Sequence, residues 1–501
     1  MRVLLEMRAA LDGHAGIPQA TRLLFRSLRQ LPGVEVQGLL QSGNLVLEPG
    51  LPMRDGELLP LTDALDRIDR LSKVVVSLQQ GPASHRLEHL RKRLLKLGGP
   101  LWAALRALLG LREPLTGFDP AQFQDYVWRA MFARSLPASD LPAVTGGLFR
   151  VLRWPWSLVN AVGVGSGALG WALYPRLDTQ GIDVMIAETP YPGRVRHGTK
   201  LVVRYHDAIP LLMPHTIKDR GYHRSQHLLA LQRNARDGAW FACVSEATRR
   251  DLLSVLPGAE ARCVTIPNML SHHYHPESAD ASRVPEIIWS RKNRHAPHHG
   301  GLDMGEAERQ RAGQPYLLMV STLEPRKNTL ALLEAWELLR ANGHGQLHLV
   351  CVGSLGWDHG SILSRLTPWL GRGGVHLLEN VPADDLRLLY RHASLTVCPS
   401  VAEGFDFSGI EAMASGGLVA ASDIPVHREI YQDASAYFNP YSSADMASVM
   451  AALLVPEAGA RHEALRAAGQ RVAEGYRPEV VLPRWSALLE RLVGRAGTLR
   501  V

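Results

Sequence analysis

The chain has 501 residues, more than one ordinary hydrophobic core supports, so two domains are expected. With 46% hydrophobic and 21% charged residues it has the composition of a globular protein, which excludes a disordered chain. The net charge of +7 favours a protein that binds anionic ligands or lies near an anionic membrane. Nucleic acid is not an expected partner, because no motif combines aromatic with basic side chains as nucleic-acid readers do.

The chain begins with a strand-loop-helix unit of the doubly wound kind, in which loops at the carboxyl ends of strands bind ligands. Arg2–Glu6 is the first predicted strand, a turn with Gly13 and Gly16 follows, and Val34–Leu40 is the next strand. Between turn and strand, leucines at helical spacing predict a helix that ends near residue 31. The turn is interpreted either as a ligand loop or as a plain tight turn.

Residues 51–180 are expected to be an insertion of helices. From Arg86 to Arg112 seven basic residues and one glutamate accompany leucines at a spacing of three to four, which is typical of an interfacial helix. Trp154–Pro175 then carries no charge over 22 residues. Three interpretations stay open for this run: contact with a membrane surface, burial in a helical cap, and a membrane span.

Two further strands are predicted at Ile182–Ala187 and Leu201–Tyr205. The second is followed at once by His206 and Asp207, a pair well placed for chemistry at the carboxyl end of a strand. A histidine satisfied by its own loop is the alternative. Ser245, after another strand, is a plausible helix N-cap.

Six histidines lie in residues 271–313, which are expected to be a polar linker. Their spacing matches no standard metal site and no acidic partner is positioned beside them, so no metal is predicted. The four cysteines lie in or beside apolar runs and are predicted to be buried in the core. A reducing cytoplasm is the expected environment. Residues 1–8 hold too short an apolar run for a signal peptide, so a cytoplasmic location is expected, peripheral to the inner face of the membrane.

From residue 314 onward, short apolar runs alternate with helical patterns, which predicts a parallel sheet covered on both faces. Arg326 and Lys327 stand between the strand Tyr316–Val320 and the helix Thr329–Arg340. Two cations at a helix start oppose the helix dipole, a mild cost that favours a functional interpretation. They are suited to neutralising a departing diphosphate.

The most informative stretch joins the strand Leu395–Cys398, a loop with Gly404 and Gly409, and a helix N-terminus, which together make an anion site. Glu403 and Glu411 flank this loop. Carboxylates repel phosphate, so we expect these two to accept hydrogen bonds from hydroxyl groups. A nucleotide-sugar carries both phosphate and hydroxyl groups and so fits such a site. The alternative is that Glu403 is a solvated loop residue and that Glu411 only complements the helix dipole.

Glu403 and Glu411 match the E-x7-E signature of the retaining family 4 glycosyltransferases, and Ser415–Ile430 looks like that family's continuation. The block Ser321–Asn328 is similar to the family's phosphate-binding block. The resemblance covers nearly all of 315–495 and is patchier before residue 275. Departures from the common pattern include Thr322 in place of an Arg, Ser321 in place of a Gly, Pro18-Gln19 in place of Gly-Arg, and Asp406 in place of a Gly.

The resemblance implies an α/β fold of the GT-B type, in which two Rossmann-like doubly wound parallel-sheet domains face each other across a cleft. The expected division is an acceptor-side domain over 1–270 with a helical insertion at about 51–180, a linker over 271–313, a nucleotide-sugar domain over 314–475, and a C-terminal helix in 476–501 that packs back on the first domain.

The resemblance also implies retention at the anomeric carbon, with Glu403 on the sugar hydroxyls, Glu411 on the ribose diol and His206 near the reacting carbon. No cofactor or metal is expected beyond the nucleotide-diphosphate sugar, and no Asp-x-Asp motif occurs. The expected site residues are catalytic His206, Asp207 and Glu403, donor-binding Arg326, Lys327, Gly404, Phe405, Ser408, Gly409 and Glu411, and loop residues Gly13 and Gly16.

The expected function is transfer of a mannose-type or similar hexose from GDP or UDP to a glycan or polyprenyl-linked acceptor in surface polysaccharide biosynthesis, with an anionic membrane surface as a further partner. An epimerase or hydrolase of the same fold and an inactive scaffold are the alternatives.

Overall fold

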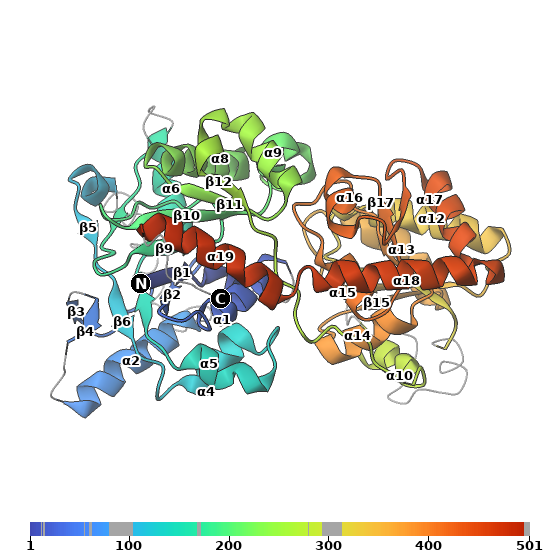
Figure 1. Cartoon of the computed structure of the whole chain (residues 1–501), viewed down its shortest axis with the longest axis horizontal. Coiled ribbons are helices and arrows are strands. Elements are labelled where there is room, and N and C mark those ends of the chain that lie inside the picture. Colours follow the sequence, from blue (N-terminus) through green and yellow to red (C-terminus); the bar gives the residue numbers. More distant parts are fainter. Residues whose placement is uncertain are drawn as a thin grey trace.

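The computed structural model describes residues 1–11, 13, 16–54, 56–59, 63–79, 104–167, 172–278, 280–292 and 313–494. Most of the predicted basic leucine pattern and three of the linker histidines, His295, His298 and His299, lie outside these residues. Two α/β units lie side by side, one formed by the first half of the chain and the other by the second (Figure 1).

The N-terminal unit is built on an eight-stranded sheet in the order β12-β11-β10-β9-β1-β2-β7-β6. All neighbouring strands are parallel except β6, which runs antiparallel to β7. The central strands are apolar and buried, as a sheet covered on both faces requires. The strands are β1 (Arg2–Glu6), β2 (Glu35–Leu40), β6 (Thr116–Phe118), β7 (Phe149–Val151), β9 (Val184–Ala187), β10 (Lys200–Tyr205), β11 (Trp240–Cys243) and β12 (Cys263–Thr265).

The prediction that residues 51–180 are an insertion of helices alone is wrong, because β6 and β7 extend the main sheet from within this segment. Strand β7 pairs with β2 at Gly38 opposite Phe149. A Cβ atom at Gly38 would lie 2.4 Å from the Phe149 ring, so the glycine lets this ring pack over the sheet. The segment also holds the helices α2 (Ala64–Leu78), α4 (Gln124–Val127) and α5 (Leu141–Thr145).

The uncharged run at 154–175 forms helix α6 (Trp156–Gly167), which packs on α8 (Arg220–Arg236). Trp154, Tyr174 and Ala230 form a buried cluster there. The described residues of this run thus pack on the N-terminal unit, and contact of their outer face with a membrane surface stays a prediction. Across the described part of the chain, no helix has the length and apolar character of a membrane span.

The C-terminal unit is a six-stranded, wholly parallel sheet in the order β15-β14-β13-β16-β17-β18. Its strands are β13 (Tyr316–Val320), β14 (His348–Val352), β15 (Val375–Leu378), β16 (Leu395–Cys398), β17 (Val419–Ser422) and β18 (Ala436–Phe438). Its helices are α12 (Thr329–Ala341), α13 (Gly360–Arg372), α14 (Ala383–His392), α15 (Phe407–Ala414), α16 (Pro425–Tyr431), α17 (Ser443–Leu454) and α18 (Gly459–Glu474). The predicted α/β architecture with two parallel sheets is thus confirmed.

The predicted linker is not wholly a linker, because helix α10 (Arg283–Ser290) belongs to the second unit. Val284, Ile287 and Ile288 point into its core, and α10 packs on α14. The three- and four-residue spacing of these side chains is the amphipathic signal that the surrounding polar residues obscured. Within the described parts of the chain, no group of three or more histidine, cysteine or acidic side chains is arranged to hold a metal ion.

The chain crosses between the two units twice, and the crossings are bonded to each other. The Leu270 amide on the way out donates to the Tyr476 carbonyl on the way back, at 2.7 Å. Helix α19 (Pro478–Val493) then returns to the N-terminal unit, where Trp485 and Leu489 join its core. Figure 1 shows α19 lying over the first unit while α18 runs along the second. All four cysteines are buried and free, as predicted.

Candidate active site

The loop after β16 meets the carboxyl end of β10 across the gap between the two units. A Cβ atom at Gly404 would lie 1.6 Å from the His206 carbonyl oxygen and 3.1 Å from the Asp207 Cβ atom. Only a glycine permits this approach. The Ser245 hydroxyl donates to the Gly404 carbonyl at 2.8 Å and also caps α9 (Glu246–Val255). The predicted residues His206, Asp207 and Gly404 therefore lie together.

Arg326 and Lys327 converge on Glu403 from the short turn after β13. The Arg326 guanidinium donates to Glu403 Oε2 and to Glu324 Oε1, both at 2.8 Å, and Lys327 Nζ donates to Glu403 Oε1 at 2.5 Å. Burial alone would raise the pKa of Glu403, but the two cations hold it below its ordinary value. One charged cluster thus contains Arg326 and Lys327, which are predicted to bind the diphosphate, and Glu403, which is predicted to bind the sugar.

His206 is buried against a carboxylate that the sequence did not single out. Its Nε2 lies 3.1 Å from Glu188 Oε2, and Glu188 also accepts from Arg204 at 3.3 Å. Burial lowers the pKa of His206, while Arg204 and His206 hold the pKa of Glu188 down against its own burial. His206 is therefore neutral at neutral pH, with Nε2–H donated to Glu188 and Nδ1 left as an acceptor. The signal for Glu188 was its place at the end of β9, beside β10.

Glu411, expected on the ribose diol, lies on helix α15 and is buried at the boundary of the two units. Its Oε1 accepts from Gln19 Nε2 at 2.8 Å and its Oε2 accepts from the Tyr390 hydroxyl at 3.1 Å. Burial raises the pKa of Glu411 to about 7. Gln19 departs from the family's pattern, but it lies 392 positions from Glu411 in the sequence, so no local signal predicts this contact.

The glycine turn of the first unit leads directly into this contact. Gly13 and Gly16 have positive φ angles of 71° and 72°, and α1 (Ile17–Leu28) starts immediately after them. Arg22 of α1 donates to the Gly13 carbonyl at 2.9 Å and so ties the turn to its own helix. Gln19, in the first turn of α1, carries this segment against α15.

The N-terminus of α15 is capped by Asp406, the residue that stands for a glycine in the family's pattern. Asp406 Oδ1 accepts from the Ser408 amide at 3.1 Å and from the Ser408 hydroxyl at 2.7 Å. Ser408, predicted to bind the donor, therefore directs both its amide and its hydroxyl at Asp406 in this conformation. At Gly409, a Cβ atom would lie 2.3 Å from the Tyr431 ring, so this glycine serves close packing.

Phe405, predicted to bind the donor, packs instead with aromatic neighbours. Its ring centroid lies 5.1 Å from that of Phe407 and 5.5 Å from that of Tyr476. This contact couples the site loop to the residue at which the chain returns to the first unit.

Two further contacts hold the units together beside the site. Glu429 of α16 accepts from the amides of Glu246 and Ala247, at 2.6 and 2.8 Å, in the first turn of α9. A carboxylate at a helix N-terminus is favoured by the helix dipole. The Trp357 indole donates to the Thr216 carbonyl at 2.9 Å.

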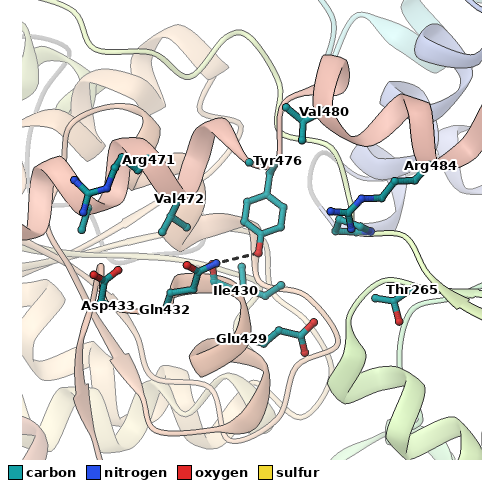
Figure 2. A pocket seen from close by; sticks show the side chains of 13 residues that line it. Thr265, Glu429, Ile430, Gln432, Asp433, Arg471, Val472, Tyr476, Val480 and Arg484 are labelled. Carbon is teal, nitrogen blue, oxygen red and sulfur yellow. Dashed lines mark hydrogen bonds between the residues drawn. The ribbon is translucent and has the colours of Figure 1, made fainter. Parts of the chain in front are cut away.

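A cavity of about 520 Å³ lies at the two chain crossings rather than at the charged cluster. Figure 2 shows Arg471 and Arg484 on either side of Tyr476, whose hydroxyl donates to the Ile430 carbonyl at 3.3 Å. The lining of this cavity includes Glu429 but none of the site residues predicted from the sequence.

Two protein-family models match the chain. "Glycosyl transferases group 1" matches residues 305–471 and "Glycosyltransferase Family 4" matches residues 129–273. Between them they include the His206–Asp207 pair and the loop from Glu403 to Glu411.

Curated relatives include O-antigen chain mannosyltransferase B of Escherichia coli, 34% identical over 131 residues, which is 26% of this chain and 34% of that protein. A second is the serotype-specific mannosyltransferase WbdA of Escherichia coli, 25% identical over 261 residues, or 52% of this chain and 30% of that protein. The matches thus span about a third of the length of these relatives.

Solved structures share the fold. HepE of Anabaena in complex with UDP-glucose aligns with a TM-score of 0.56 at 13% identity, covering 98% of this chain and 100% of that chain. Sucrose-phosphate synthase of Thermosynechococcus elongatus aligns with a TM-score of 0.55 at 13% identity, covering 99% and 100%. With the family models, the relatives and the two-sheet architecture in agreement, the chain belongs to the family 4 glycosyltransferases.

Proposed function

We propose that this chain is a retaining glycosyltransferase that moves a mannose-type or similar hexose from a nucleotide-diphosphate sugar to a glycan or lipid-linked acceptor in surface polysaccharide biosynthesis. One observation carries the proposal: the cluster of Arg326, Lys327 and Glu403 adjoins Gly404, which touches the His206–Asp207 backbone. The mannosyltransferase relatives support the sugar, and the O-antigen chain in the name of one of them supports the pathway class.

In this proposal a diphosphate competes with Glu403 for the two cations. It carries more negative charge than one carboxylate, and that charge grows as the glycosidic bond breaks, so Arg326 and Lys327 bind it most strongly in the transition state. Glu403 is then free to accept hydrogen bonds from sugar hydroxyls. The two cations and the α15 dipole supply the positive charge, so the proposal needs no metal.

The proposed transfer proceeds on one face of the sugar. The acceptor hydroxyl attacks the anomeric carbon from the side of the departing phosphate, the carbon–oxygen bond to the diphosphate breaks, and a phosphate oxygen takes the acceptor proton. The new glycosidic bond keeps the configuration of the donor, and no covalent bond to the protein forms.

The experiment that tests this is a thermal-shift panel of GDP- and UDP-sugars on the wild type, on Glu411→Ala and on the exposed control Glu463→Ala. We expect one donor to stabilise wild type and control but not Glu411→Ala. Product configuration, read from the anomeric proton coupling, tests retention. No shift with any donor at millimolar concentration contradicts the proposal.

We further propose that the enzyme works at an anionic membrane surface, as a lipid-linked acceptor requires. Leu108 and Leu109 are 69% and 62% exposed, beside the basic residues Arg106 and Arg112. The double variant Leu108→Ser/Leu109→Ser should sediment less with anionic liposomes at low salt than the control Leu338→Ser, whose leucine is exposed on α12. Equal sedimentation of the two variants contradicts the membrane proposal.

A further inference from the structure

His427, on α16, is fully buried beneath the donor loop, although the reaction proposed above makes no use of it. Its Nδ1 lies 3.0 Å from the Ser422 carbonyl oxygen at the end of β17. Its Nε2 lies 3.3 Å from Asp406 Oδ2. The imidazole stacks on the Tyr431 ring, with centroids 5.0 Å apart and planes inclined by 19°. Both ring nitrogens therefore face oxygen atoms.

These contacts fix the protonation of the ring. A carbonyl oxygen only accepts, so Nδ1 must carry a hydrogen. In a neutral ring, Nε2 would then present a lone pair to a carboxylate oxygen, which is repulsive. A proton on Nε2 removes this repulsion and turns the contact, at 3.3 Å, into an ion pair. The pKa of Asp406 is held well below its ordinary value: burial would raise it, but the contact with His427 and the charge of Lys327 outweigh burial.

The charge of Asp406 is costly where it stands. It lies at the N-terminus of α15, where the proposed function places a diphosphate, and it acts on the two carboxylates of the signature, Glu403 and Glu411, raising the pKa of each. A third uncompensated carboxylate would repel the phosphates. The imidazolium of His427 cancels this charge while Asp406 still caps the helix through Ser408.

We propose that His427 is a positioning residue that acts through Asp406, as the buried counter-charge that makes the loop before α15 compatible with nucleoside diphosphate binding. The inference rests on the proposed function. The titratable groups around the ring are Asp406 from the loop and Tyr431 from α16, with Cys398 of β16 and Lys327 beyond Asp406.

The competing explanation is that His427 only fills space against Tyr431. A double-mutant cycle separates the two, because a space-filling role does not depend on the charge of Asp406. The variants are His427→Gln, Asp406→Asn and the double variant, and the probes are GDP and UDP, titrated by calorimetry at one fixed pH. Melting temperatures of the same four proteins supply a readout that needs no ligand.

We expect His427→Gln to weaken nucleotide binding about tenfold, and the double variant to return to within about threefold of wild type. Asp406→Asn should bind nucleotide within about threefold of wild type, and it tests the inference even where His427→Gln does not fold. Equal losses in His427→Gln and the double variant, in affinity and in melting temperature, overturn the inference. If wild type binds neither nucleotide, the proposed function fails, and the melting temperatures alone decide on the ion pair.

Discussion

Replacing Glu411 by glutamine should make the protein less sensitive to pH. Burial raises the pKa of this carboxyl from 4.5 to about 7, so the folded state holds its proton more tightly than the unfolded state. The free energy of unfolding therefore falls as the pH rises from about 4.5 to about 7. The shift corresponds to about 3 kcal/mol over the whole window, since one pKa unit is about 1.4 kcal/mol. A glutamine has no proton to lose, and Glu411→Gln should be flat in this window.

About 2 kcal/mol of this effect falls between about pH 5.5 and about pH 8. A domain of this size changes its melting temperature by roughly 2–4 °C per kcal/mol, so the gap between Glu411→Gln and wild type should widen by about 4–8 °C in favour of the variant at the higher pH. The glutamine keeps an oxygen for Gln19 and can accept from or donate to Tyr390, which limits its own cost.

The assay is melting followed by tryptophan fluorescence at the two pH values, on wild type, Glu411→Gln and the exposed control Glu463→Gln. The control should follow wild type at both. The reasoning is refuted if the gap between Glu411→Gln and wild type is the same at both pH values within about 1 °C, which at this domain size is a fraction of a kcal/mol.

Three further substitutions test the closed arrangement. Gly404→Ala puts a methyl group 1.6 Å from the His206 carbonyl, so we expect turnover to fall about 100-fold and the radius of gyration in small-angle scattering to grow; an unchanged rate contradicts the contact. Arg326→Ala leaves Glu403 with a single cation partner and should cost about 3–5 kcal/mol of unfolding free energy in urea, and a cost below about 1 kcal/mol would argue against a buried pair. Glu429→Gln should weaken the closure of the two units by about 1 kcal/mol. We expect a larger radius of gyration at an unchanged melting temperature. Scattering identical to that of wild type would show that Glu429 does not hold the units together.

Much of the fold could be predicted from apolar runs. The strands β1, β13 and β16 have the bounds that the sequence predicts, because a parallel strand buried on both faces leaves a largely apolar run. Strands β6 and β7 were not predicted, because each has only three residues and β7 contains a charged residue, Arg150. The Arg150 side chain is buried and donates a hydrogen bond to Gln37.

In the site, charged and glycine residues within one loop could be predicted, but contacts between distant segments could not. Arg326, Lys327 and Glu403 stood out by residue type and position. Gln19 meets Glu411 only because helices 392 positions apart face each other. His427 was read as part of a matching run, and its ion pair depends on the packing of α16 under the donor loop.

The contacts that close the two units against each other draw largely on the main chain. Glu429 binds two amides of α9, Ser245 binds the carbonyl of Gly404, and Trp357 binds the carbonyl of Thr216. Main-chain groups are present whatever the side chain, so the first unit can change its side chains at α9 and at Thr216 without losing these bonds to the second unit. Such a chain is suited to modular evolution, in which one C-terminal half is combined with new N-terminal halves. Chimeras joined at the crossings near Leu270 and Tyr476 would reproduce that process in the laboratory.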